Sequence, residues 1–180
     1  MKVTKTELPG VLIIEPKVHG DARGFFIETF QVEKYRELAG IELTFVQDNH
    51  SRSQYGVLRG IHAQKLHPQG KLVRVVTGEV FDVAVDIDPV SETFGSWVGT
   101  LLSESNGHQL WIPPGYAHGF VVLSDVADFE YKCTDYYHPE DEYGLIWNDP
   151  EVNVNWPIES PTLSEKDLQL PSLAQLREGV

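Results

Sequence analysis

Short apolar runs separated by turns fill the middle of the chain, and this spacing leaves few folds open. Residues 71–87 read KLVRVVTGEVFDVAVDI, residues 94–103 read FGSWVGTLLS, and DFEYKCTDYY begins at Asp128. Asp82 and Asp86 alternate with apolar neighbours, which is the period-two pattern of a half-buried strand. Residues 77–79, Thr-Gly-Glu, have the composition of a hairpin turn. Short strands at intervals of about 8 to 12 residues, with few helices, predict a sandwich or barrel.

The first third of the chain adds strands and one short helix. VLIIEP (residues 11–16) predicts a strand, and HGDARGFFIETF (residues 19–30) begins as a turn and becomes a strand. EKYRELAG predicts a helix over residues 33–40 that stops at its final glycine. ELTFV (residues 42–46) predicts a strand leading into the polar run QDNHS (residues 47–51), whose composition is common in turns.

Length and composition predict a single soluble domain over residues 1–180. A chain of 180 residues is long enough to bury a core of its own, and no repeat or linker divides it. We see no charged-then-apolar leader and no apolar run of the roughly 20 residues that a membrane span needs. The one cysteine, Cys133, is expected to be a small buried residue, which agrees with a reducing compartment. We therefore expect a cytoplasmic protein.

The net charge limits the classes of ligand. Lys and Arg together number 14 and Asp and Glu 27, so the formal net charge is −13. This balance argues against nucleic acid or an anionic membrane as a partner. An anionic ligand would need a local group of basic side chains, so the positions of the few basic residues are informative.

Two apolar runs carry regularly placed polar residues. Residues 56–78 and 110–123 contain the patterns G-x5-H-x-Q and P-x-G-x-x-H, whose fixed points are Gly56, His62, Gln64, Pro113, Gly115 and His118. This pair resembles the two motifs of the cupin β-barrel superfamily, which supply three His and one Glu to a metal ion. Here Gln64 and Lys71 stand at two of those ligand positions. Because a charged ammonium has no lone pair to donate, we expect the pocket without the metal.

Nine segments in order support a closer resemblance. They are GDARGFFIETF, FVQDNHS, VLRGIHAQ, GKLVRVVTGEVFDVAVDI, FGSWVG, LWIPPGYAHGFVVLS, YKCTDYY, WNDPEV and LSEKD. From residue 3 to about residue 170 the chain resembles the dTDP-4-dehydrorhamnose 3,5-epimerases, metal-independent cupins that invert two carbons of a dTDP-4-keto-6-deoxy sugar. The resemblance implies an all-β fold, a cupin-type jelly-roll β-barrel with a few short peripheral helices and a helical C-terminal tail. It also implies a homodimer and no cofactor.

The resemblance assigns the chemistry to four side chains. Both inverted carbons lie next to the C4 ketone, so each proton needs a base, and the resulting enolate needs a nearby positive or donor group. By similarity His62 is the base, Asp167 orients it, Lys71 stabilises the enolate and Tyr131 returns a proton from the opposite face. From pattern alone, Asp167 would be the carboxylate of a capping box begun at Ser164, and Tyr131 a core aromatic.

The resemblance also assigns the substrate contacts. Ten positions carry the expected residue types: Arg23, Glu28, Gln47, Asp48, Asn49, Arg59, Lys71, His118, Glu142 and Lys166. Arginine suits phosphate oxygens because its planar fork binds them in pairs. Without the resemblance, Arg23 would be a solvated turn cation, and His118 could also be a satisfied core histidine.

Three functions stay open at this point. The first is epimerisation at both C3 and C5. The second is inversion of a single carbon, or isomerisation, of another dTDP-4-keto-6-deoxy sugar on the same scaffold. The third is a metal-dependent cupin oxygenase or a non-catalytic sugar-binding module. Metal analysis of the purified protein separates this class, because stoichiometric iron, manganese or zinc would contradict the argument from Gln64 and Lys71.

Overall fold

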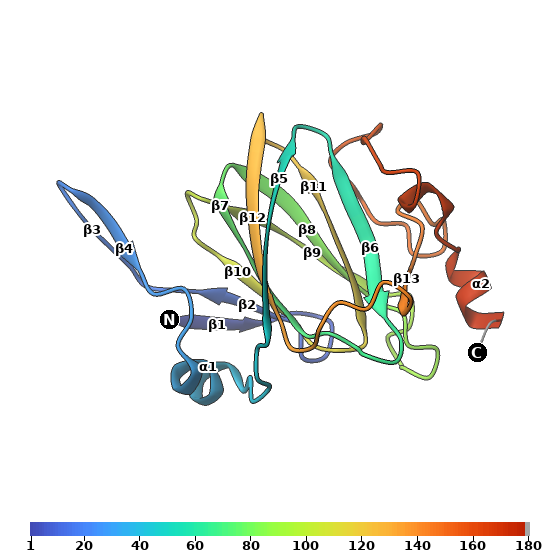
Figure 1. Cartoon of the computed structure of the whole chain (residues 1–180), viewed down its shortest axis with the longest axis horizontal. Helices are drawn as coiled ribbons and strands as arrows, with labels where there is room; N and C mark the ends of the chain where they lie inside the picture. Colours follow the sequence, from blue (N-terminus) through green and yellow to red (C-terminus); the bar gives the residue numbers. More distant parts are fainter. Residues whose placement is uncertain (179–180) are drawn as a thin grey trace.

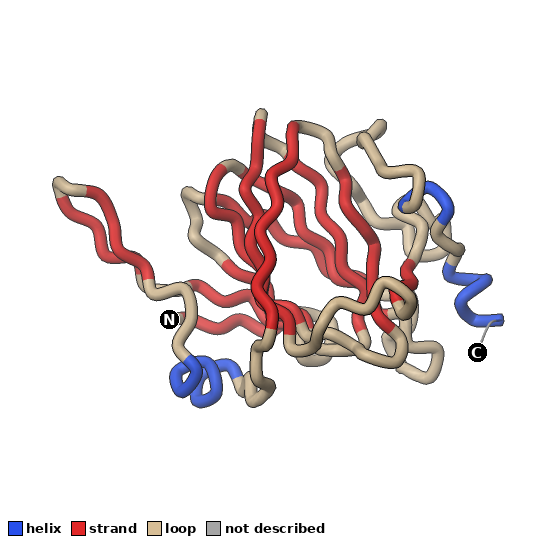
Figure 2. The backbone as a smooth tube through the Cα atoms, viewed as in Figure 1, coloured by secondary structure: helices blue, strands red, loops and turns tan. Residues whose placement is uncertain are grey.

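The structure, a computed structural model, describes residues 1–178. Strands dominate it, and the helices are short and lie at the periphery (Figures 1 and 2). The elements are β1 (Lys2–Lys5), β2 (Leu12–Glu15), β3 (Val18–Asp21), β4 (Gly24–Ile27), α1 (Val32–Ala39), β5 (Gln47–Gln54), β6 (Leu58–Gln64), β7 (Lys71–Thr77), β8 (Glu79–Asp86), β9 (Trp97–Ser103), β10 (Gln109–Ile112), β11 (Tyr116–Val122), β12 (Val126–Cys133), β13 (Glu142–Gly144), the 3₁₀ helix η1 (Asp167–Gln169) and α2 (Leu173–Glu178). No helix among the described residues is both long and apolar enough to cross a membrane.

Two sheets and a separate hairpin account for all the strands described. One sheet has the strand order β1-β2-β10-β7-β12-β5, and the other has the order β13-β6-β11-β8-β9. Neighbouring strands pair antiparallel throughout, as in β12 with β5 and β8 with β9. The prediction of an all-β jelly-roll fold with short peripheral helices is confirmed.

A core of apolar side chains lies between the two sheets. It includes Val73 and Val75 from β7, Ala84 from β8, Phe120 from β11 and Phe129 from β12, all nearly or fully buried. The Phe120 and Phe129 rings stack with centroids 4.0 Å apart. Fully burying one large apolar side chain contributes about 1.5–3 kcal/mol, so this layer supplies much of the force that holds the sheets together.

The turn predicted at residues 77–79 is not a hairpin, and that prediction was wrong. β7 pairs with β10 and β12 in the six-stranded sheet, whereas β8 pairs with β11 and β9 in the other. The single residue between them, Gly78, has φ 80°, and a Cβ there would overlap the Val126 carbonyl oxygen. One residue is too short for a hairpin loop, so the chain passes here from one sheet to the other.

We expected a strand at residues 42–46, but the strand before β6 begins only at residue 47. Residues 42–46 are irregular, and the polar run 47–51, whose composition is common in turns, lies inside β5. β5 pairs with β12 alone and forms an edge of the six-stranded sheet. An edge strand tolerates polar side chains because one of its sides faces solvent. By contrast, α1 confirms the predicted helix, and Gly40 ends it with φ 68°.

The β3–β4 hairpin projects away from the two sheets (Figure 1). Phe25 and Phe26 on β4 are 72% and 69% exposed, so neither belongs to the core of this chain. Arg23 lies at the turn of the hairpin and forms an ion pair with Asp21. The hairpin therefore offers apolar and charged side chains with little protein around them.

The C-terminal segment covers the outer face of the five-stranded sheet. Leu145, Val152 and Leu173 are buried against Ile61 and other residues of that face. Residues 162–167 also continue along β6 beyond the short strand β13. The Leu58 N–H donates to the Thr162 carbonyl oxygen at 2.9 Å, and Val57 and Thr162 form a parallel bridge. This docking carries Asp167 to the edge of β6.

We expect Leu110→Ala to lower the free energy of unfolding by about 2–5 kcal/mol, because Leu110 is 1% exposed between the sheets and truncation leaves a cavity. The same change at Leu66, which is 77% exposed, should alter it by no more than about 0.5 kcal/mol. Urea unfolding followed by circular dichroism measures both values. Equal losses in the two variants would contradict the assignment of this core.

Candidate active site

Two adjoining cavities open between the sheets near β6. The first has a volume of about 450 Å³ and the second about 330 Å³. Four side chains line both cavities: His62, Lys71, Tyr131 and Lys166. Ile61 and Ala63 pack under the C-terminal segment, so the alternation of β6 turns His62 to the opposite side, toward the cavities. The four shared side chains come from β6, β7, β12 and the C-terminal segment.

His62 and Asp167 form a close polar contact at the wall of the first cavity. The His62 Nε2 lies 2.7 Å from Asp167 Oδ1, although the residues are 105 positions apart. The Asp167 side chain is 6% exposed and the imidazole 28% exposed. Because a carboxylate accepts the Nε2–H, the neutral ring is held with Nδ1 unprotonated, and no described residue bonds to Nδ1.

Neighbouring groups keep Asp167 ionised. Burial alone would raise the pKa of this carboxyl, but hydrogen bonds from His62, Ser164 and the Gly60 backbone N–H lower it on balance. The Asp167 backbone N–H donates to Ser164 Oγ at 3.1 Å, so the backbone half of the predicted capping box forms. The carboxylate itself faces His62 instead of capping the 3₁₀ helix. One residue therefore starts the helix and positions the imidazole.

Lys71 begins β7, and its ammonium lies beside His62. Its Nζ is 3.5 Å from the His62 carbonyl oxygen. Burial lowers the pKa of Lys71, while the carboxylates of Glu142 and Asp82 act in the opposite direction. A cation held in a partly dry cavity interacts strongly with any negative charge that develops nearby.

Tyr131 on β12 reaches the same cavities from the other sheet. Burial raises its pKa to about 12, so the phenol stays protonated at neutral pH. No described residue forms a hydrogen bond with its hydroxyl, and the ring packs near Phe129 with centroids 6.0 Å apart. The Tyr131 phenol is therefore free to donate its proton to a molecule bound in the cavity.

His118 on β11 is buried and bonded to a carboxylate. Its Nε2 lies 2.9 Å from Asp82 Oδ2, and both residues are almost fully buried. Burial raises the pKa of Asp82, and His118 counteracts this. His118 lines the first cavity opposite His62 in the β6–β11 pairing. The sequence predicted Asp82 only as a strand residue, and nothing in its apolar neighbours indicated a hydrogen bond to His118.

Glu142 and Lys166 meet where the two cavities adjoin. The Lys166 Nζ lies 2.6 Å from Glu142 Oε1, and Glu142 lies 3.7 Å from His62 Nε2. The Tyr137 hydroxyl donates to Glu142 Oε2 at 2.5 Å, and its half-exposed ring lines the second cavity. Sequence reasoning did not select Tyr137. Its neighbour Tyr136 in the same YY pair is also exposed, so the sequence pattern could not show which of the two tyrosines lines the cavity.

Gln64 holds two loops together. Its Nε2 donates to the carbonyl oxygens of His67 at 2.7 Å and Tyr136 at 3.0 Å, and its Oε1 accepts from the His138 N–H at 2.8 Å. The amide at the cupin ligand position is therefore fully used by backbone groups. With an ammonium at the other altered position, these residues do not fit a cupin metal.

The remaining predicted binding residues fall into two groups. Arg59, Gln47 and Asn49 line the cavities, and Arg59 Nε donates to Ser53 Oγ at 2.9 Å.

Three others are held outside those two cavities by ion pairs of their own. Asp48 pairs with Lys132, Glu28 with Lys34, and Arg23 with Asp21 on the projecting hairpin. Within one chain the structure does not bring Arg23 or Glu28 to the cavities.

Known proteins resemble this chain over nearly its whole length. The family model described as dTDP-4-dehydrorhamnose 3,5-epimerase matches residues 5–175. The dTDP-4-dehydrorhamnose 3,5-epimerase of Shigella flexneri is 57% identical over 169 residues, which cover 93% of each chain. The crystal structure of a Legionella pneumophila dTDP-6-deoxy-D-glucose-3,5-epimerase with dTDP-4-keto-L-rhamnose has a TM-score of 0.93 at 56% identity, covering 97% of this chain and 96% of that one.

A more distant structure shares the scaffold. A 3′-monoepimerase of Streptomyces bikiniensis in complex with dTDP-quinovose has a TM-score of 0.90 at 30% identity, covering 96% of this chain and 88% of that one. The family model and the close relatives agree with one another and with the all-β architecture. The chain therefore belongs to the dTDP-4-dehydrorhamnose 3,5-epimerase family of isomerases.

Proposed function

We propose that this protein epimerises C3 and C5 of dTDP-4-dehydro-6-deoxy-D-glucose to give dTDP-4-dehydro-L-rhamnose, a step of dTDP-L-rhamnose biosynthesis. One observation carries the proposal: a carboxylate-bound imidazole, a free phenol and an ammonium line one cavity. The names of the close relatives support the same reaction. We further propose that the chain acts as one domain in the cytoplasm and binds neither nucleic acid nor membrane.

His62 is the base in this proposal. With its Nε2–H donated to Asp167, its Nδ1 lone pair is available to accept the proton from C3 or C5. The Asp167 carboxylate also stabilises the imidazolium that forms. General bases of this kind contribute about 10²- to 10⁴-fold to a rate.

Lys71 stabilises the enolate. Removal of a proton next to the ketone moves negative charge onto the C4 oxygen, and a preorganised cation lowers the energy of that state. The position of Lys71 beside His62 supports this role. Gln64 and Lys71 together replace two expected metal ligands, and we propose that the reaction uses no metal ion or other cofactor.

Tyr131 returns the proton. Inversion needs delivery from the face opposite the base, and Tyr131 belongs to the six-stranded sheet while His62 belongs to the five-stranded one. Its high pKa keeps the phenol protonated until the carbanion forms, and proton donation to a carbanion is favourable.

The nucleotide and the sugar hydroxyls bind around this centre. Arg59 is our candidate for the diphosphate because it lines the first cavity and its guanidinium can bind phosphate oxygens in pairs. We assign the other contacts, to sugar and nucleoside, to the remaining predicted residues: Gln47, Asp48, Asn49, His118, Glu142 and Lys166.

A second subunit completes the site in our proposal. Arg23 and Glu28 belong to the projecting β3–β4 region, which carries exposed phenylalanines. A homodimer in which each hairpin packs on the other subunit would bury those rings and place Arg23 and Glu28 near the partner's cavity. Symmetric pairs of this kind are the commonest oligomers.

Incubation of the protein with dTDP-4-dehydro-6-deoxy-D-glucose in heavy water should incorporate deuterium at both C3 and C5, because both protons pass through solvent-exchangeable groups. Proton NMR of the nucleotide sugar measures each position. Deuterium at only one carbon would favour the alternative, a single-carbon epimerase. The structural similarity to the Streptomyces 3′-monoepimerase is the observation that supports this alternative.

His62→Asn should reduce exchange at both carbons by about 10²- to 10⁴-fold, since it removes the base. Tyr131→Phe should leave exchange measurable but reduce inversion, so that deuterium enters with retained configuration. NMR of the products distinguishes these results. His50→Asn, a matched change at an exposed histidine that also contacts carboxylates, should leave both rates unchanged.

If Tyr131→Phe epimerises the substrate as fast as the wild type, Tyr131 is not the proton donor. If His62→Asn exchanges deuterium as fast as the wild type, His62 is not the base.

Co-expression of Arg23→Ala and His62→Asn chains tests the shared site. If hairpins cross between subunits, one site of each hybrid dimer has both native residues, and random pairing should restore about one quarter of the wild-type activity. Arg23→Ala alone should be far less active at low substrate, since a charged hydrogen bond to phosphate contributes about 1.5–3 kcal/mol. His62→Asn alone should be far less active because it lacks the base. A mixture no more active than the mean of the two variants would refute the exchange.

A further inference from the structure

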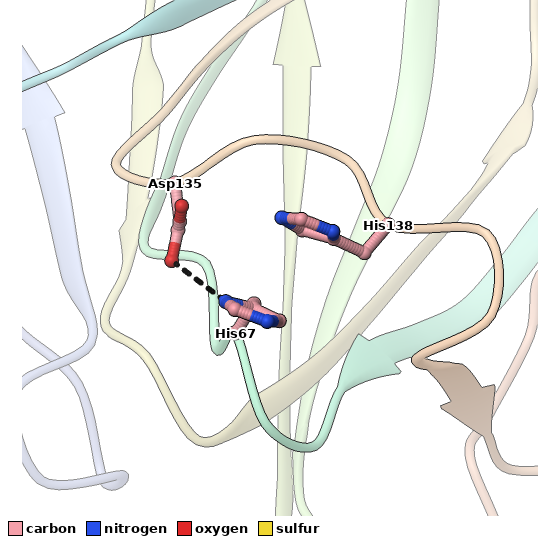
Figure 3. Close-up of side chains that lie close together, drawn as sticks. All are labelled: His67, Asp135 and His138. Atoms are coloured by element: carbon pink, nitrogen blue, oxygen red, sulfur yellow. Dashed lines mark ion pairs between the residues drawn. The ribbon is translucent and has the colours of Figure 1, made fainter.

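Two histidines and an aspartate gather on the loops beside the second cavity. His67 lies between β6 and β7, and Asp135 and His138 lie between β12 and β13 (Figure 3). One possible ligand atom from each residue lies within 4.8 Å of the others, and His67 Nδ1 is 3.7 Å from Asp135 Oδ2. None of the three lines the two cavities that hold His62 and Tyr131.

The loops that carry this cluster are held in place by their own backbone contacts. Gln64 bonds to the backbone of both loops, as described above, and Gln69 Nε2 donates to the Asp135 carbonyl oxygen at 2.8 Å. The Asp141 carboxylate accepts from the backbone N–H groups of Leu66 and His67. The Cα positions of the three residues are therefore fixed before any ligand arrives, while their side chains stay partly exposed.

The residue types suit a transition-metal cation. Neutral imidazole is a good ligand for Zn²⁺, Ni²⁺ and Cu²⁺, and a carboxylate adds a negative charge. Ligand bonds of about 2.0–2.2 Å put two ligands of a tetrahedral ion roughly 3.3–3.6 Å apart. The 3.7 Å between His67 and Asp135 is close to that spacing. The net charge of −13 also attracts cations to the surface.

We propose that His67, Asp135 and His138 form a surface site for a divalent transition-metal cation, with Zn²⁺ as the reference ion. The two imidazoles stack with centroids 4.0 Å apart and planes 18° apart, so their in-plane lone pairs run side by side. Binding requires one ring to turn toward the other ligands. His67 Nδ1 already faces Asp135, so His138 is the ring that turns, away from Glu140, whose Oε1 lies 3.4 Å from its Nδ1.

A bound ion would tie the two loops together near the second cavity. Tyr137 lies between Asp135 and His138 in the chain and lines that cavity, as do Gln64 and Gln69. The ion would therefore act on the position of Tyr137 and not on the proton transfers. The proposal stands apart from the proposed epimerase reaction, because the ligands differ from every residue assigned to it.

The test is titration of the tag-free, full-length protein with ZnSO₄ by isothermal calorimetry, with metal content after dialysis measured by mass spectrometry. We expect one Zn²⁺ per chain. His67→Gln, Asp135→Asn and His138→Gln should each weaken binding by at least about tenfold, as loss of metal-site groups does. His50→Gln is the matched control, because its two ring nitrogens already face different carboxylates, and it should bind Zn²⁺ as the wild type does.

Circular dichroism should show that each variant is folded, because the substituted side chains are partly exposed. Absence of saturable binding, or equal binding by all four variants and the wild type, would overturn the proposal. Binding lost in His62→Gln but retained in the three variants would place the ion in the cavity and would overturn it as well. Each of these readouts is independent of epimerase activity.

Discussion

The hydrogen bond between His62 and Asp167 is the contact on which the site depends. It joins strand β6 to a segment 105 residues later, so it forms only when the C-terminal segment has docked along the edge of the sheet. Docking buries Asp167, and the hydrogen bonds it receives there keep it ionised against the cost of burial. The same contact fixes which nitrogen of His62 carries the proton. Assembly of the fold and orientation of the His62 imidazole are therefore one event.

The second constraint is the set of polar side chains between the sheets. Each must have a partner or face a cavity, because burial without hydrogen bonds is costly. Asp82 meets this demand by bonding to His118, and Gln64 by bonding three backbone groups. Lys71 and Tyr131 face the cavities instead. The hydrogen bonds of Asp82 and Gln64 therefore help to hold the walls of the cavities in place.

Much of the fold could be predicted from period-two patterns, and the errors have physical causes. The patterns detect a strand but not its partners, so the turn at Gly78 was read as a hairpin although it joins two sheets. The polar strand β5 escaped notice because an edge strand needs no apolar alternation. In the site, the resemblance supplied Asp167, whose local pattern is that of a helix start. Tyr137 was missed because its place depends on a loop fixed by distant residues.

The tautomer of His62 in the free protein is the most direct test of its proposed role, and ¹⁵N NMR of labelled histidine measures it, with His62→Asn used to assign the signal. For the neutral form of the ring we expect the proton on Nε2, because that nitrogen faces Asp167, and an unprotonated Nδ1. Asp167→Asn should disturb this preference. A ring protonated at Nδ1 in the wild type would leave its only lone pair on Nε2, which faces Asp167, and would contradict the proposed role of Nδ1 as the proton acceptor.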